Sequence, residues 1–101
     1  MTDFHRRCKF PTPVERARVA ADWRSRGYSC ALFVDPPGRA WTDFVHGSNE
    51  LITVAAGRLE VTVRDVRVVA EPGDEVFIPK GVRHSVRNIH DDETHWLYGY
   101  D

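Results

Sequence analysis

The sequence lacks the features that would direct it to several classes of partner. Its 14 lysines and arginines are balanced by 15 acidic residues, giving a net charge of −1. Without a basic excess, binding to a phosphate backbone is not expected. No apolar run approaches the roughly 20 residues that span a bilayer. Residues 1–10 carry Arg6, Arg7 and Lys9 with no apolar segment behind them. We therefore expect no nucleic-acid partner, no membrane segment, no signal peptide and a cytoplasmic location.

Cysteine is also scarce, and the chain is short. Cys8 and Cys30 are the two cysteines, and their spacing forms no CxxC motif. We expect reduced thiols; the alternatives are a Cys8–Cys30 disulfide or Cys8 as a metal ligand. With 101 residues, 42% of them hydrophobic and 29% charged, the chain is predicted to be one globular domain, 1–101.

One segment has the signals of a helix. Thr12 is a capping residue type, Pro13 suits the first helical position, and Glu15 stands three residues after the cap. Gly27 is a typical C-terminal stop. We predict a helix over 13–26 on the outside of the domain. The sequence leaves open whether residues 1–12 are disordered or pair with a second chain.

The residues after Gly27 have the pattern of short strands. Leu59, Val61 and Val63 alternate with polar residues, and turn signals such as Asp35 to Gly38 separate the segments. We predict eight strands, over 29–34, 40–46, 50–56, 58–64, 66–70, 75–78, 83–89 and 94–100. Closely spaced short strands with no helix between them are typical of an antiparallel sandwich or barrel.

Three polar residues on these strands point to metal chemistry. His46 ends one predicted strand, with Thr42 and Phe44 on its face, and Glu50 opens the next. His84 lies on a later strand. Two imidazoles and one carboxylate facing a common interior form the set that non-haem iron sites use, and zinc, manganese, nickel and copper also fit.

The glycines and prolines around these residues make the pattern specific, and the sequence resembles the cupin family. The family's first motif, G-x5-H-x-H-x3-E-x6-G, is matched in spacing by Gly38, Phe44, His46, Glu50 and Gly57. The second, G-x5-P-x-G-x2-H-x3-N, is matched by Gly73, Pro79, Gly81, His84 and Asn88. One position differs, because Phe44 stands where the family has its first histidine.

The resemblance implies an all-β jelly-roll barrel, the double-stranded β-helix of cupins, over about 28–101, with an extension and one helix over about 1–27. It also implies that His46, Glu50 and His84 bind a divalent metal in the lumen. Phe44 has no donor atom. Either the metal keeps three protein ligands and open positions, as a catalytic site requires, or the metal is lost and the three residues form a buried hydrogen-bonded cluster. Iron, manganese, zinc, nickel and copper are not distinguished.

The other motif residues are expected to shape the backbone. Those expected at turns or strand ends are Gly38, Gly57, Gly73, Pro79 and Gly81. We expect Asn88 to tie down a turn, the alternative being support of His84 from outside its ligand set.

Aromatic residues on the last strand suggest a pocket. Trp96, Tyr98 and Tyr100 share one face by alternation. If that face is inward, we expect Trp96 and Tyr98 to line a small-molecule pocket with Phe44; the alternative is ordinary core or dimer packing. His95 then points outward. In the opposite register it would point inward and replace the missing ligand.

Cupins share a fold more than a function. Our first hypothesis is a metal-dependent enzyme, of oxygenase, isomerase or lyase type, acting on a small organic molecule. The second is a binding or sensing module without turnover, which the loss of a ligand at Phe44 favours. We also expect a homodimer formed through an exposed strand edge or the N-terminal segment.

Overall fold

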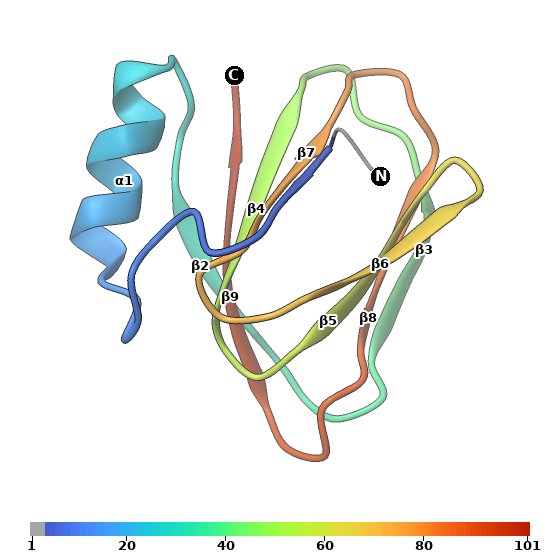
Figure 1. Ribbon diagram of the computed structural model, residues 1–101. Coiled ribbons are helices and arrows are strands. Elements are labelled where there is room, and N and C mark those ends of the chain that lie inside the picture. The colour runs from blue at the N-terminus through green and yellow to red at the C-terminus, as the bar shows by residue number, and fades with distance from the viewer. Residues whose placement is uncertain (1–3) are drawn as a thin grey trace.

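Two antiparallel sheets face each other in the computed structural model, which describes residues 4–101 (Figure 1). The elements in chain order are β1 (His5–Arg6), α1 (Arg16–Ser25), β2 (Ala31–Asp35), β3 (Ala40–Phe44), β4 (Glu50–Ala56), β5 (Leu59–Val63), β6 (Val66–Ala70), β7 (Glu75–Ile78), β8 (His84–Asn88) and β9 (Thr94–Tyr100). One sheet has the order β1-β7-β4-β9-β2 and the other β3-β8-β5-β6. This confirms the predicted all-β jelly roll with an N-terminal helix.

The main core lies between the sheets because their facing strands place apolar residues inward. On β5, Leu59, Val61 and Val63 are buried, as their alternation predicted. They belong to one cluster with Ile52 and Val54 of β4 in the opposite sheet. Burial of this kind contributes roughly 25 cal/mol per Å² of apolar surface, so the contact between β4 and β5 is a main source of cohesion between the layers.

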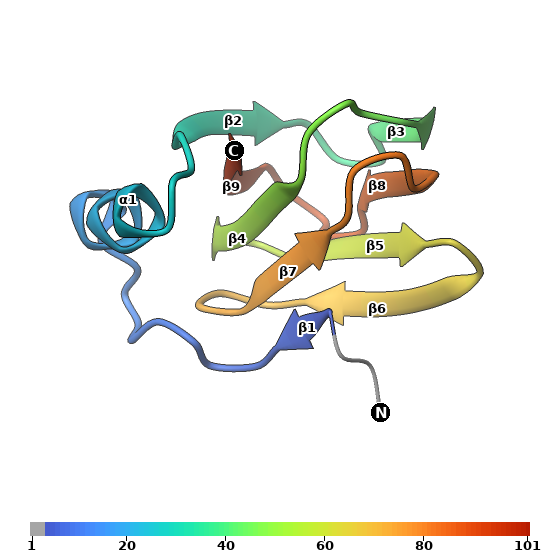
Figure 2. The ribbon, with the colours of Figure 1, turned by 90° about the horizontal axis from the view of Figure 1, so that it is seen from above.

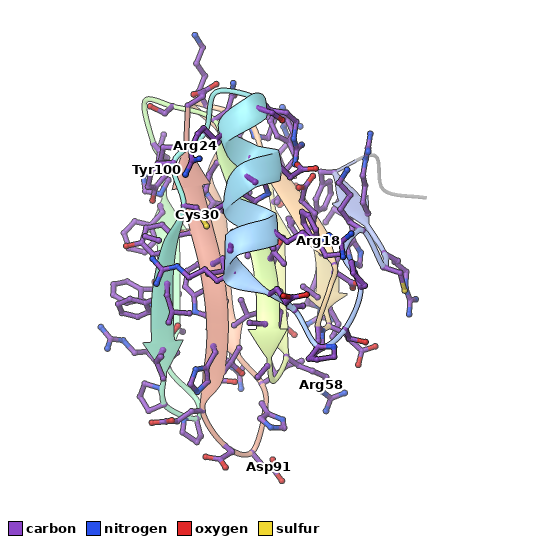
Figure 3. The ribbon with its side chains drawn as sticks, turned by 90° about the vertical axis from the view of Figure 1, so that its left-hand side faces the viewer. Arg18, Arg24, Cys30, Arg58, Asp91 and Tyr100 are labelled. Carbon is purple, nitrogen blue, oxygen red and sulfur yellow. The ribbon has the colours of Figure 1, made fainter. Side chains whose placement is uncertain are left out.

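The helix covers the other side of the five-stranded sheet (Figures 2 and 3). Val19 and Trp23 of α1 are fully buried, in one cluster with Leu51 of β4. Trp23 Nε1 also donates a hydrogen bond of 3.0 Å to Glu75 Oε1, and Arg26 pairs with the same carboxylate. Strand β4 is therefore covered on both faces. Among residues 4–101, no helix combines the length and apolar character needed to cross a membrane.

The predicted start of the helix was wrong. Helical structure begins at Arg16, and Thr12 and Pro13 lie outside it. Glu15 is the N-cap, and its side chain makes no capping hydrogen bond. The reason is a tertiary contact, because buried Phe10 is tied to the sheet by a backbone hydrogen bond of 2.9 Å to the Gly73 carbonyl. This contact holds residue 10 against the domain, so the chain turns into the helix only beyond it.

Residues 4–12 pack on their own chain in this structure. Strand β1 pairs with β7, with His5 opposite Val76. His5 Nε2 lies 2.9 Å from Asp74 Oδ2, and the Cys8 backbone N–H donates to Asp74 Oδ1 at 3.0 Å. Residues 1–3 lie outside the described part of the chain.

Strand β3 departs from simple alternation. Trp41 pairs with Val86 and Phe44 with His84, so three steps along β3 match two along β8. This is a β-bulge, and within it Asp43 has a φ of 56°. Trp41 and Phe44 consequently both face the interior. The prediction that Thr42 shares the inward face was wrong, because the extra residue leaves it exposed.

Asn88 joins several segments at one end of the sandwich. It is 1% exposed. Its Nδ2 lies 3.0 Å from each of three carbonyl oxygens, those of Asp35, Pro36 and Asp92. Its Oδ1 accepts hydrogen bonds from the His90 backbone N–H and the Thr94 hydroxyl at 2.9 and 2.7 Å. Asn88 thus holds together the loops that follow β2 and β8, and makes no contact of this kind with His84.

The substitution Asn88→Ala is expected to lower the free energy of unfolding by about 3 kcal/mol, because the buried Thr94 hydroxyl and the loop carbonyls lose their partner. Urea unfolding followed by circular dichroism measures this. The matched control is Asn49→Ala, since Asn49 makes its hydrogen bonds at the exposed surface. Its expected loss is below about 1 kcal/mol. Equal losses in the two variants would contradict a central role for Asn88.

Candidate metal centre

His46, Glu50 and His84 approach one another from three different elements. Glu50 is the first residue of β4 and His84 the first of β8, on facing sheets. His46 was predicted to end a strand, but β3 ends at Phe44, and His46 lies in the connection to β4. The Gly81 N–H fixes that connection by donating to the His46 carbonyl at 2.8 Å. The imidazole is therefore positioned by a loop contact and not by strand alternation.

The three side chains form a compact donor set. One ligand atom from each lies within 4.8 Å of the others. His46 Nε2 and His84 Nε2 are 3.5 and 3.3 Å from Glu50 Oε1. That oxygen is buried and accepts no hydrogen bond. Because a buried carboxylate that accepts no hydrogen bond is costly, this oxygen would be stabilised by a bound cation, or by a proton on His84 Nε2 at 3.3 Å.

The orientation of the His84 ring also suits metal binding. Its Nδ1 lies 3.1 Å from the Val82 carbonyl oxygen, which can only accept, so Nδ1 carries the proton. Nε2 then presents its lone pair toward Glu50, in the tautomer that suits a metal ligand. Burial alone would lower the pKa of His84, but Glu50 and the Val82 carbonyl outweigh it, so the pKa lies above its ordinary value.

Two aromatic rings border the donor set. Phe44 stacks on His46, with ring centroids 5.7 Å apart and planes 16° from parallel. On the other side, the Tyr100 hydroxyl lies 3.5 Å from His46 Nε2. Burial, together with Glu50 and Tyr98, raises the pKa of Tyr100 to about 12. Its hydroxyl therefore keeps its proton near neutral pH and can donate a hydrogen bond.

A cavity of about 220 Å³ opens beside these residues. It is lined mainly by aromatic side chains: Phe33, Trp41, Phe44, His46, Glu50, His84, Val86, Trp96, Tyr98 and Tyr100. Phe44, Trp96 and Tyr98, which the sequence suggested for a pocket, are all among them, and Tyr100 shares their inward face. The sequence reasoning missed Phe33, Trp41 and Val86. Trp41 is turned inward by the bulge in β3, and Phe33 is brought against Trp96 by the pairing of β2 with β9.

The two alternative ligands considered from the sequence lie elsewhere. The His95 side chain is 44% exposed and lies 3.7 Å from a Glu93 carboxylate oxygen, on the outward face of β9. Cys8 is an exposed free cysteine whose backbone N–H, and not its thiol, contacts Asp74. Among the described residues, 4–101, the grouping of possible ligand side chains is therefore His46, Glu50 and His84.

Asp35 is a further residue of the site that the sequence reasoning missed, having taken it as part of a turn. Its side chain is fully buried behind the cavity wall. It accepts hydrogen bonds from Trp96 Nε1 at 2.9 Å and Trp41 Nε1 at 3.2 Å, and Arg39 Nε lies 3.7 Å from it. Asp35 thereby fixes two of the rings that line the cavity. A carboxylate close behind two tryptophans of different strands gives no signal in the sequence.

Comparison with known proteins identifies the architecture. The family model for the cupin domain matches residues 31–100. Similar solved structures include a cupin 2 domain-containing protein from Halorhodospira halophila, with 24% identity and a TM-score of 0.68 over 73% of this chain and 52% of that one. The plu4264 protein of Photorhabdus luminescens is 22% identical, with a TM-score of 0.66 over 72% of this chain and 61% of that one.

Oxalate oxidase in complex with the substrate analogue glycolate is also similar, at 21% identity and a TM-score of 0.67, over 75% of this chain and 42% of that one. At such identities the likeness shows the fold alone. The chain spans less than two thirds of the length of each of these three proteins. A search of curated proteins found no significant match.

Two buried glutamates provide a test of the donor set. Glu50 and Glu75 are 3% and 4% exposed, but Glu75 is paired with Trp23 and Arg26, whereas Glu50 Oε1 has no donor. In metal-free protein at alkaline pH, Glu75→Gln is expected to lower the free energy of unfolding by about 2 kcal/mol. Glu50→Gln is expected to cost nothing, or to raise it by up to about 1 kcal/mol, because it removes an unpaired buried charge.

Urea unfolding of the two variants beside the unaltered protein makes the comparison. A loss in Glu50→Gln as large as that in Glu75→Gln would show that the carboxylate is held by the two imidazoles as a structural cluster. That result would favour the metal-free alternative.

Proposed function

The chain belongs to the cupin family, and from this premise we propose that it binds one divalent metal ion through His46, Glu50 and His84 and acts as a metal-dependent enzyme on a small organic molecule. The observation that carries the proposal is the buried Glu50 Oε1, which has no hydrogen-bond donor and two imidazole nitrogens within 3.5 Å. Iron, manganese, zinc, nickel and copper all accept this mixture of nitrogen and oxygen donors.

A metal ion bound there would supply Lewis acidity, or electron transfer if it is redox-active. The chain's own residues supply the remaining functions. Glu50 brings negative charge into the lumen, and the Val82 carbonyl keeps His84 Nε2 turned toward the centre. Phe44 contributes no donor, which leaves room for a substrate atom. Tyr100 keeps its proton and can hold a polar substrate atom through its hydroxyl.

The second candidate is a binding or sensing protein without turnover. Phe44 favours it, because its ring stacks on His46 and lies 6.2 Å from the His84 ring, where the family's motif has a further histidine. In this case the three polar residues are remnants of a metal site, and the aromatic cavity alone binds a ligand. Metal content separates the two candidates.

Three further expectations stay predictions. They are a homodimer, a cytoplasmic location and the absence of a nucleic-acid partner. For the homodimer, edge strand β2 offers Leu32 and Val34, which are 41% and 37% exposed. An edge strand that carries apolar side chains is a common place for two chains to pair.

Protein purified without an affinity tag or chelator is expected to contain about one equivalent of a divalent metal, as judged by elemental analysis. His84→Ala is expected to lose the metal, because His84 is the more buried of the two imidazole ligands. His95→Ala is the matched control, since that imidazole lies on the outward face, and is expected to keep the metal. If neither the unaltered protein nor the control takes up Co²⁺, Mn²⁺ or Zn²⁺ on addition, the enzyme proposal is wrong and the second candidate stands.

Metal affinity is expected to fall as the pH falls. The raised pKa of His84 means that Nε2 holds its proton up to a higher pH than an ordinary imidazole does. A metal has to displace that proton, so the apparent affinity for Co²⁺ should fall by up to about tenfold per pH unit once the pH is below the raised pKa. In metal-free protein the same proton stabilises the fold, fully below the ordinary pKa, and this stabilisation is lost as the pH rises through the raised pKa.

Cobalt absorption titrations at several pH values measure this dependence. His95→Gln is expected to leave the profile unchanged. An affinity that does not vary with pH on the acidic side of neutrality would show that His84 Nε2 is not a ligand.

A further inference from the structure

We propose that the cavity beside His46, Glu50 and His84 selects a small, uncharged molecule with a single aromatic ring. The inference deepens the proposed function and rests on it, since it names the class of compound that the same site would take. Four features of the cavity wall carry it: its aromatic rings, the direction of its indole N–H groups, its charge and its volume.

Six aromatic rings from both sheets form a continuous wall. They are Phe33, Trp41, Phe44, Trp96, Tyr98 and Tyr100. Phe33 meets the rings of Trp41, Trp96 and Tyr98 edge to face, at centroid distances of 5.4 to 6.5 Å. Aromatic pairs in such arrangements contribute beyond their buried area, because the edge of one ring is attracted to the face of another. A planar ring that enters the cavity can extend this set of contacts, and a puckered aliphatic ring cannot.

Asp35 removes the polar atoms of the two tryptophans from the cavity. Both indole N–H groups donate to its carboxylate, which is fully buried and is not among the groups that line the cavity. Trp41 and Trp96 are therefore left with carbon atoms to present inward. The polar groups of His46, Glu50 and His84 lie at the metal centre, with the Tyr100 hydroxyl beside His46. A ligand is thus offered an apolar wall at one end and polar donors at the other.

The charge of the wall disfavours ionic ligands. Glu50 is the sole acidic lining residue, and no lysine or arginine is among the lining residues. Arg39 is not among the lining residues, and its guanidinium is stacked 4.3 Å over the Trp41 ring. A dianion such as oxalate therefore finds no lysine or arginine in the wall. An ammonium ligand would be repelled by the divalent metal that the proposed function places in the lumen.

The volume limits the ligand to one ring. The cavity measures about 220 Å³. An apolar cavity of roughly 150 Å³ binds benzene, whereas pockets for drug-sized molecules start at roughly 300 Å³. One substituted six-membered ring fits between these limits, and a fused or two-ring compound would extend out of the cavity.

The three tryptophans supply the readout. Trp41 and Trp96 line the cavity, whereas Trp23 belongs to α1 and packs on the other side of the sheet. In NMR titrations of metal-free protein, phenol is expected to shift the indole signals of Trp41 and Trp96 to saturation and to leave that of Trp23 in place. Cyclohexanol, similar in size but not planar, is expected to bind at least about tenfold more weakly. Tetramethylammonium and oxalate, the cationic and anionic probes, are compared with phenol in the zinc-loaded protein.

Matched variants tie the response to the cavity. Val86→Phe puts a ring into the cavity and is expected to abolish phenol binding. Val69→Phe makes the same change at an exposed position of β6, and this variant is expected to bind phenol as the unaltered protein does. Should Val86→Phe fail to fold, Tyr98→Leu keeps the apolar lining but removes a ring, and is expected to reduce the preference for phenol over cyclohexanol.

Equal binding of phenol and cyclohexanol, tighter binding of either charged probe, or no binding of phenol would overturn the inference. Because phenol and cyclohexanol are titrated without metal, the outcome of that comparison is separate from that of the metal analysis. Phenol binding in a protein that takes up no metal would retire the proposed enzyme and keep the aromatic specificity. Metal uptake without phenol binding would keep the proposed enzyme and retire the aromatic specificity.

Discussion

The carboxylate of Glu50 lies between two sheets without a hydrogen-bond donor, and much of the structure serves to keep it there. Strand β4, which carries it, is paired on both sides, with β7 and β9. One face of β4 packs into the sandwich core and the other lies beneath α1. A residue at the start of so restrained a strand cannot move toward solvent. The cost of burying the charge is therefore met by cohesion elsewhere, a pattern typical of functional sites.

Comparison among the buried carboxylates makes Glu50 distinctive. Glu75 accepts from an indole N–H and an arginine, and Asp35 accepts from two indole N–H groups. The fold thus satisfies two buried acids with tryptophan donors that attach the helix and shape the cavity wall. Glu50 Oε1 lies within 3.5 Å of two imidazole nitrogens and accepts a hydrogen bond from neither. The absence of a hydrogen bond to Glu50 Oε1 is therefore particular to this site, since Glu75 and Asp35 both accept hydrogen bonds.

Sequence patterns were sufficient where strands are regular and pair along their length. The bounds of β4, β6, β7 and β9 agree with the predicted strands, and the alternation in β5 gave its buried face. The patterns failed where tertiary contacts override local preference. Phe10 displaced the start of the helix, the bulge at Asp43 changed which residues of β3 face inward, and His46 proved to lie beyond its strand. For the site, motif spacing identified the polar residues that converge. It did not reveal Asp35 or Phe33, whose positions depend on pairing between distant strands.

The bulge in β3 also bears on how this cavity can diverge between related proteins. As an edge strand, β3 pairs with β8 alone, so gaining or losing one residue there disturbs a single ladder of hydrogen bonds. Such a change would rotate Trp41 or Phe44 out of the wall and alter the shape offered to a ligand. Glu50 and His84, on β4 and β8, would stay where they are, and the Gly81 N–H would still hold His46 in the loop after β3. Insertions and deletions of single codons in β3 are therefore a route by which ligand preference can evolve without rebuilding the metal centre.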